Sequence, residues 1–292
     1  MVKIKHIVVV AIASIVMYAC SNSNNSLLVD FDHSGQALKD SDTLVKYLTN
    51  HYYDASSDAI MPLASGETAL IDDSNLTTQD VTENDIDYKL YIYKIREGNP
   101  DPVKGFPTQM DSVLTKYEGS QLRSALDADV FETQNTPIWL TLDAVIRGWS
   151  YGFTHFKGGK NSTDNGPITF ENGGKGYLII PSGLAYRNQQ GGIIAPNSCL
   201  VFKIDLFDFV EHTDHDNDRI PSSLEIEDAS VQDDPRQVNT DGDQFANYRD
   251  ADDDNDGVLT KNEDANGDGD PRNDFSDPNN PTLPDYLNPK IN

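Results

Sequence analysis

The sequence of 292 residues predicts an α+β fold, in which an antiparallel sheet wraps across one short helix and a loop-rich tail follows. Three observations support this prediction. Segments 87–95, 113–119, 177–180 and 199–207 are rich in β-branched and aromatic residues, as strands are. Segment 142–156 carries apolar residues three and four apart, which is typical of one helical face. Strands and helices do not alternate as they would in a parallel βαβ fold.

The N-terminus has the composition of an export signal. Two lysines precede an apolar run over residues 7–18, which is too short to span a bilayer as a helix. The Met-Tyr-Ala-Cys motif that ends at Cys20 resembles a bacterial lipobox. We therefore predict a signal peptide over 1–19, a lipid on Cys20 and a small, polar tether over 20–35. A plain signal peptide that is cut nearby is the alternative.

Negative charge is concentrated at one end of the chain. The formal net charge is −26, and residues 211–292 hold 23 acidic and 6 basic side chains, which gives this segment a net charge of −17. Such a surface argues against nucleic acid as a partner, because binding to phosphates requires basic residues. Divalent cations are the partners that fit this charge.

The segment 36–100 is expected to form an N-terminal region with one helix and one strand. Leu44, Leu48 and Tyr52 fall at helical spacings, which predicts a helix over 36–53. A Gly-Asn-Pro-Asp-Pro run ends the strand at 87–95. The sequence leaves open whether this region packs on the following domain or extends its sheet.

Three separate segments supply the residues of one apolar pocket. They are 145–149, which ends in a Trp, 176–181 and 193–202. No Ser/His/Asp set, cysteine nucleophile or phosphate-binding loop accompanies them. A pocket of this kind suits chemistry that depends on shape and dryness more than on proton transfer.

This ordered set of residues resembles the FKBP-type peptidyl-prolyl cis–trans isomerases over residues 111–209. The resemblance implies an FKBP-like sheet and a domain over 101–210 with isomerase activity and no cofactor. It assigns the site to Tyr117, Phe131, Glu132, Val145, Ile146, Trp149, Tyr186, Ile193, Ile194 and Phe202. In the family, residues at these positions form the floor (Trp149) and the flap (Ile193 and Ile194), and the backbone N–H at Ile146 holds a substrate carbonyl.

The chain departs from the family pattern at three positions of this site. Glu132 stands where most members have Asp, Ala195 where they have the first Pro after the flap, and Arg187 where they have Gly. The polar, glycine-rich segment 158–174 is an insertion relative to compact members. Taken singly, an aromatic residue such as Trp149 is equally well explained as a core residue, so the prediction depends on the ordered combination.

The tail contains the spacing of a twelve-residue calcium loop. Its ligand positions in 252–263 are occupied by Asp252, Asp254, Asp256, Val258 (through its carbonyl), Thr260 and Glu263. A glycine stands at the sixth position, where the loop turns sharply. Oxygen ligands at this spacing indicate Ca²⁺ as a structural ion.

Related loops recur in the tail. Asp214, Asp216, Asp218 and Glu225 repeat the spacing with Arg219 in place of Gly, and Asn239, Asp241, Asp243 and Asp250 repeat it again. Few apolar residues flank these loops, so paired EF-hand helices are not expected. The array over 211–292 resembles thrombospondin type 3 repeats, which implies that bound calcium replaces a hydrophobic core. A disordered acidic tail is the alternative interpretation.

These features together predict a peptidyl-prolyl isomerase that assists the folding of exported, proline-containing polypeptides. It would be a lipoprotein anchored through Cys20, in the outer membrane facing the periplasm or the cell surface. Two alternatives remain at this point. One is a proline-peptide binding module without turnover, and the other is a calcium-dependent structural or adhesion lipoprotein at the surface.

Overall fold

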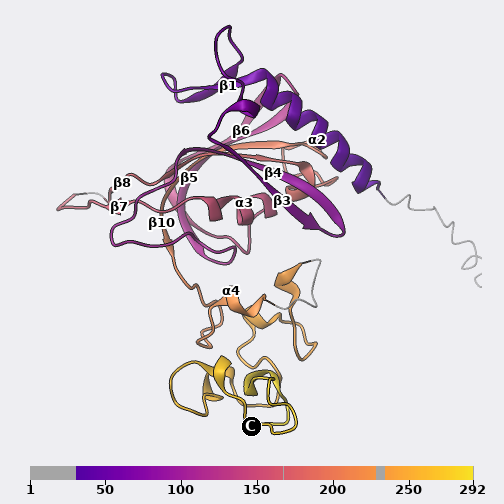
Figure 1. The fold of residues 1–292 in the computed structure, drawn as a ribbon, viewed down its shortest axis with the longest axis vertical. Helices are drawn as coiled ribbons and strands as arrows, with labels where there is room; N and C mark the ends of the chain where they lie inside the picture. Colours follow the sequence, from indigo (N-terminus) through magenta and orange to yellow (C-terminus); the bar gives the residue numbers. More distant parts are fainter. Residues whose placement is uncertain (1–30, 167, 228–233, 292) are drawn as a thin grey trace, which may run out of the picture. The chain divides into compact units, whose positions relative to one another are not determined.

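An antiparallel sheet of six strands is the largest sheet among the described residues (Figure 1). The computed structural model describes residues 31–166, 168–227 and 234–291. The strands of this sheet are β3 (Leu76–Glu83), β4 (Ile86–Arg96), β5 (Ser112–Ser124), β6 (Asp127–Thr141), β9 (Gly174–Ile180) and β10 (Leu200–Val210). Their spatial order is β3-β4-β9-β10-β5-β6. The antiparallel α+β prediction is therefore confirmed.

Alternation along the central strands gives the sheet two apolar faces. Leu178 and Ile180 on β9 and Phe202 on β10 belong to one buried cluster, whereas Tyr177 and Ile179 belong to another. Successive side chains of a strand point to opposite faces, so two clusters from one strand mean that both faces are covered. Residue Leu178 pairs with Phe202 on one side and with Ile92 of β4 on the other.

A short helix, α3 (Arg147–Gly152), covers the first face and continues as a 3₁₀ turn (Phe153–His155). Two glycines allow this close packing. A Cβ on Gly148 would lie 2.4 Å from Ile180, and one on Gly152 would lie 2.6 Å from Leu178. Residues 142–146 form turns and extended backbone that lead into the helix, and the apolar helical face expected after Val145 falls on α3 and the 3₁₀ turn.

The helix α2 (His33–Asn50) covers the second face of the sheet (Figure 1). Its Leu44, Tyr47 and Leu48 are buried there. Leu44 and Leu48 were expected from their helical spacing, whereas the third predicted residue, Tyr52, lies in the strand that follows. At its other buried position, Asp40 accepts hydrogen bonds from the backbone N–H (2.8 Å) and hydroxyl (2.6 Å) of Ser182. The N-terminal region therefore both packs on the sheet, through its helix, and extends the sheet, through β3 and β4.

Two small hairpins complete this part of the chain. The helix ends at Asn50, before the predicted 53, because β1 (His51–Asp54) begins there and pairs with β2 (Ala59–Pro62). The glycine-rich insertion at 158–174 forms a second hairpin from β7 (Lys160–Asn161) and β8 (Phe170–Glu171).

The tail after β10 consists of loops and single turns, as predicted. One short helix, α4 (Ser222–Glu225), is followed by the 3₁₀ turns Pro235–Gln237, Asn247–Arg249, Thr260–Asn262, Pro271–Asn273 and Asp285–Leu287. The buried apolar side chains among its described residues are Ile220, Val238, Tyr248 and Tyr286. Apart from Pro271, the other buried side chains of its described residues are acidic, amide or hydroxyl ones.

The predicted signal peptide 1–19, the lipidation site Cys20 and most of the tether lie outside the described residues. The part of the chain that the structure describes contains no helix that is both long enough and apolar enough to cross a bilayer.

Candidate active site and acidic tail

A cavity of about 510 Å³ opens on the first face of the sheet, beside α3. Eight of the ten predicted site residues line it: Tyr117, Phe131, Glu132, Val145, Ile146, Trp149, Tyr186 and Phe202. They come from β5, β6, β10, α3, the segment before α3 and the loop that follows β9. Tyr186 is 40% exposed, so the cavity reaches the surface at its side chain.

Four aromatic rings form the walls and floor of this cavity. The Trp149 indole meets the ring of Tyr117 at a centroid distance of 4.9 Å and that of Phe202 at 5.0 Å, both nearly perpendicular. Phe131 packs edge-on against Phe202 at 5.7 Å. Edge-to-face contacts of this kind fix ring orientations, so the walls keep their shape without a ligand. The indole is only 4% exposed, yet it lines the cavity, so it is accessible as a floor.

The segment before α3 brings a free backbone donor to the cavity. Ile146 adopts an extended conformation (φ −60°, ψ 144°), and its carbonyl accepts the N–H of Trp149 at 2.8 Å. No hydrogen bond joins the Ile146 N–H to an acceptor among the described residues. The hydroxyl of Ser150 donates to the Leu142 carbonyl at 2.5 Å and holds the two ends of the segment together.

The polar rim contains a carboxylate and two phenols. Burial, followed by the charge of Glu132 and its hydrogen bond, raises the pKa of Tyr117 to about 12. Burial and the same carboxylate also raise the pKa of Tyr186. Both tyrosines are therefore hydrogen-bond donors at neutral pH. Glu132 and Tyr117 lie together at the rim, as the sequence suggested.

The other two predicted residues, Ile193 and Ile194, do not line the cavity. A tight turn joins the N–H of Ile194 to the carbonyl of Gly191 at 3.0 Å. This turn leaves Ile193 69% exposed and places Ile194, which is 4% exposed, in the apolar core. Their role as a flap over a bound substrate stays a prediction.

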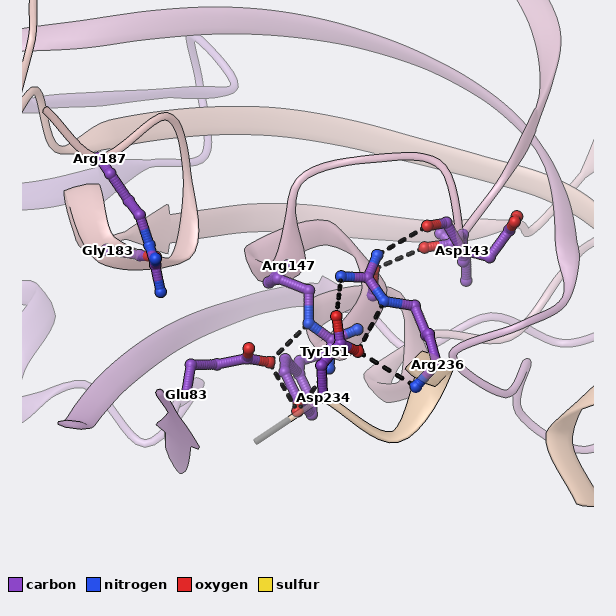
Figure 2. Close-up of polar contacts among 10 residues, drawn as sticks. Glu83, Asp143, Arg147, Tyr151, Gly183, Arg187, Asp234 and Arg236 are labelled. Atoms are coloured by element: carbon purple, nitrogen blue, oxygen red, sulfur yellow. Dashed lines mark hydrogen bonds and ion pairs between the residues drawn. The ribbon is translucent and has the colours of Figure 1, made fainter. Parts of the chain in front are cut away.

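Four further residues line the cavity: Leu140, Ala144, Arg147 and Ala185. Arg147 lies within the predicted pocket segment 145–149 but was given no role, and Ala144 and Ala185 are each next to a predicted residue in the chain, whereas Leu140 carried no such signal. Arg147 is fixed by the Glu83 carboxylate at 2.5 Å and by the Tyr151 hydroxyl at 2.8 Å (Figure 2). Glu83 ends β3, so the N-terminal strands help to position the cavity wall.

Comparison with known proteins matches part of this chain to one family. The family described as FKBP-type peptidyl-prolyl cis-trans isomerase matches residues 103–207, which contain all of the cavity's predicted residues. Residues 103–207 are therefore similar to the FKBP-type isomerases. The matched region begins after β4, so two strands of the sheet precede it.

Individual relatives match about a third to a half of this chain. The isomerase FkpA of Escherichia coli K12 is 34% identical over 102 residues, which are 35% of this chain and 32% of that protein. A probable FkpA of Neisseria meningitidis is 31% identical over 154 residues, 51% of this chain and 47% of that one. The crystal structure of E. coli FkpA aligns with a TM-score of 0.37 at 21% identity, covering 62% of each chain. The chain thus spans about a third to a half of the length of these curated relatives.

The tail that follows the FKBP-type domain gathers its carboxylates in clusters. Three clusters fall within single predicted loops: Asp214, Asp216 and Asp218; Asp241, Asp243 and Asp250; and Asp252, Asp254 and Asp256. A fourth cluster joins two segments and contains Asp218, Glu225 and Asp253. In each cluster one ligand atom per residue lies within 4.8 Å of the others.

Buried oxygens without partners make these clusters fit a cation. Both carboxylate oxygens of Glu225 and of Glu263 are buried without a hydrogen-bond partner among the described residues. Burial, followed by nearby carboxylates, raises the pKa of Glu225 to about 10 and that of Glu263 to about 8. Hard oxygen donors in this number are the ligands that Ca²⁺ takes.

Two predicted ligands have other partners in the structure. The Thr260 hydroxyl donates to the Asp253 carboxylate at 3.0 Å, so it is not directed at the cluster of its own loop. The Asn239 side-chain oxygen accepts the N–H of Gly242 at 2.6 Å, as the first residue of such a loop does. Asp253, in contrast, was missed, although it stands between two predicted ligands.

The FKBP-type domain and the tail are joined by several hydrogen bonds, and one of their contacts is a buried acid beside the cavity. Asp143 precedes Ala144 and Val145, and its side chain is fully buried. Arg249 lies 2.5 Å and His215 3.4 Å from its carboxylate oxygens. Arg236 donates to its backbone carbonyl at 2.8 Å and is itself paired with Asp234 (Figure 2). Three tail residues thus hold the segment that carries the cavity's backbone donor.

Proposed function

We propose that this protein catalyses the cis–trans isomerisation of prolyl peptide bonds. The observation that supports this most is the aromatic cavity in residues 103–207, where eight residues that resemble the family's site line one space. The cavity is large enough for a proline ring and its neighbours. Its rim offers the Ile146 N–H and the Tyr186 hydroxyl as donors for substrate carbonyls.

The chemistry requires no acid, base or nucleophile from the cavity. Rotation about an X–Pro bond breaks amide resonance and has a barrier of about 18–20 kcal/mol. The twisted amide loses the charge separation of the planar form, so an apolar cavity destabilises the planar form relative to it. The rings of Trp149, Tyr117 and Phe202 would hold the proline in the rotated geometry, which is differential binding of the transition state. Lowering the barrier by about 4 kcal/mol accelerates rotation about a thousandfold.

The test is an isomerisation assay on a short proline peptide with a matched pair of variants. Trp149→Leu and Phe156→Leu each remove one aromatic ring from the same apolar core, but only Trp149 lines the cavity. We expect Trp149→Leu to lower kcat/KM at least tenfold, and Phe156→Leu to change it less than about threefold. Folding of both variants is monitored by near-UV circular dichroism.

The same assay distinguishes catalysis from the alternative function, which is peptide binding without turnover. If the wild-type protein binds the peptide without accelerating its isomerisation, the cavity is a binding module and the proposal is wrong. Equal losses of kcat/KM in both variants would mean that the cavity is not where catalysis occurs.

We further propose that the protein works outside the cytoplasm on exported polypeptides, anchored by a lipid on Cys20. The support is the basic and apolar N-terminal sequence that ends in a lipobox-like motif. Metabolic labelling with a radioactive fatty acid should mark the wild-type protein and not Cys20→Ser. Equal labelling of the two proteins would contradict the anchor.

We also propose that Ca²⁺ orders the tail as a structural ion. The buried, unpartnered oxygens of Glu225 and Glu263 support this, together with the clusters that face them. Calcium would supply only charge neutralisation and coordination there, and no step of the isomerisation depends on it. Equilibrium dialysis with ⁴⁵Ca²⁺ tests this, and a protein that retains no calcium would refute it.

A further inference from the structure

Three carboxylates from two separate segments of the tail lie together in its interior. Asp218 is fully buried, Asp253 is 1% exposed and Glu225 is 4% exposed. Asp218 and Glu225 belong to the first predicted calcium loop, whereas Asp253 belongs to the loop over 252–263. The spacing rule does not count Asp253 as a ligand of either loop.

The spacing of their oxygens is that of ligands of one ion. One oxygen from each residue lies within 4.8 Å of the others. Two oxygens that bind the same Ca²⁺ at about 2.3–2.6 Å cannot be farther apart than roughly 5 Å. Without a cation, three negative charges at this separation and depth would repel each other strongly.

Hydrogen bonds orient these carboxylates toward one another. The Ile220 N–H occupies one oxygen of Asp218 at 2.7 Å, and the Thr260 hydroxyl occupies one oxygen of Asp253 at 3.0 Å. The second oxygen of each has no hydrogen-bond partner among the described residues, and neither oxygen of Glu225 has one. Four buried oxygens are therefore left for a ligand.

A further contact brings the two segments together. Arg219 stands at the position where the loop pattern has glycine, with a positive φ of 84°. Its guanidinium donates to the Lys261 carbonyl at 3.2 Å and lies 3.8 Å from Asp264. This departure from the loop pattern thus has a structural role, because it joins the first loop to the segment that carries Asp253.

We propose that Asp218, Glu225 and Asp253 bind one divalent cation of the calcium class between two segments of the tail. Asp253 is the ligand that makes this site depend on tertiary structure and not on one loop alone. The inference builds on the proposed calcium-bound tail. It adds that the first loop, 214–225, binds its ion tightly only when the segment that carries Asp253 packs against it.

The test measures the number and affinity of bound calcium ions in the whole chain by equilibrium dialysis and calorimetry, with Mg²⁺ as competitor. The variants are Asp253→Asn, Glu225→Gln and the double variant. Asp72→Asn is the control, because it removes one carboxylate from an exposed position outside the tail. Thr260→Val keeps the ligand but removes the group that orients it.

We expect Asp253→Asn and Glu225→Gln each to weaken the same single site at least tenfold, and the double variant to lose no second site. Thr260→Val should weaken that site less, and Asp72→Asn should leave all sites unchanged. Near-UV circular dichroism at saturating calcium shows that the variants fold.

Two results would overturn the inference. If Asp253→Asn binds as many ions as the wild-type protein with the same affinities, the first loop binds its ion alone, and the calcium-bound tail stands without this site. If the double variant loses two ions, the residues belong to different sites. A wild-type protein that binds no calcium would refute both this inference and the calcium-bound tail.

Discussion

The FKBP-type domain and the tail bury opposite kinds of side chains. In the domain, residues such as Phe153, Leu178 and Ile204 are fully buried in a continuous apolar cluster. In the tail, Asp218 and Thr260 are just as deeply buried, and apolar side chains are few. Burying apolar area stabilises a fold in any buffer, whereas burying unpaired carboxylates costs free energy unless a cation binds them.

The two regions therefore obtain their stability in different ways. The domain should fold without ions, while the folding of the tail should be coupled to metal binding. Asp143 connects the two, because it belongs to the segment beside the cavity and contacts Arg249 and His215 of the tail. Changes in the tail can therefore reach the cavity through one buried acid.

The largest loss of stability is expected when an apolar side chain is removed from the core of the domain. Phe153→Ala removes a fully buried ring from the core beneath the cavity and should lower the free energy of unfolding of the domain by about 3–5 kcal/mol. Chemical denaturation followed by Trp fluorescence measures this. The loss should be similar with calcium and with chelator, and a loss that appears only with chelator would contradict an ion-independent core.

The second-largest loss of stability is expected when calcium is removed from the tail. A chelator should destabilise the tail by about 4 kcal/mol relative to calcium at a thousand times its Kd. Limited proteolysis should then cut within 211–291 first and leave the domain intact. Equal protease resistance of the tail with and without calcium would show that its buried carboxylates are accommodated in another way.

The smallest effect concerns the acid that joins the two regions. Burial acts to raise the pKa of Asp143, but its contacts with His215 and Arg249 outweigh burial and hold the pKa well below its usual range. The stabilisation is therefore present above the unfolded pKa, near pH 4, and is lost as the pH falls through the folded pKa. Asp143→Asn should cost about 1–3 kcal/mol at pH 7.

The difference between wild type and Asp143→Asn, measured at each pH, isolates this contribution from other titrating groups. It should shrink as the pH falls below about 4. A difference that does not depend on pH would mean that Asp143 acts through packing and not through its charge.

Much of the domain was predictable because its signals are local. Alternating residues such as Tyr177, Leu178 and Ile179 define the two faces of a strand wherever it pairs. Eight site residues were identified from their order in the chain, and the structure places them around one cavity. Ile193 and Ile194 do not line the cavity, because a turn at two glycines sets their direction, and sequence order does not reveal that direction.

By itself, the sequence determined the α+β class, the aromatic composition of the cavity and the acidic spacing of the tail, because periodicity and residue type act over a few neighbours. Three features depend on the tertiary structure: β3 and β4 extend the sheet, three residues of the tail contact Asp143, and Asp253 lies beside Asp218 and Glu225. Such contacts depend on which distant segments meet, and that is set by the packing of the whole chain.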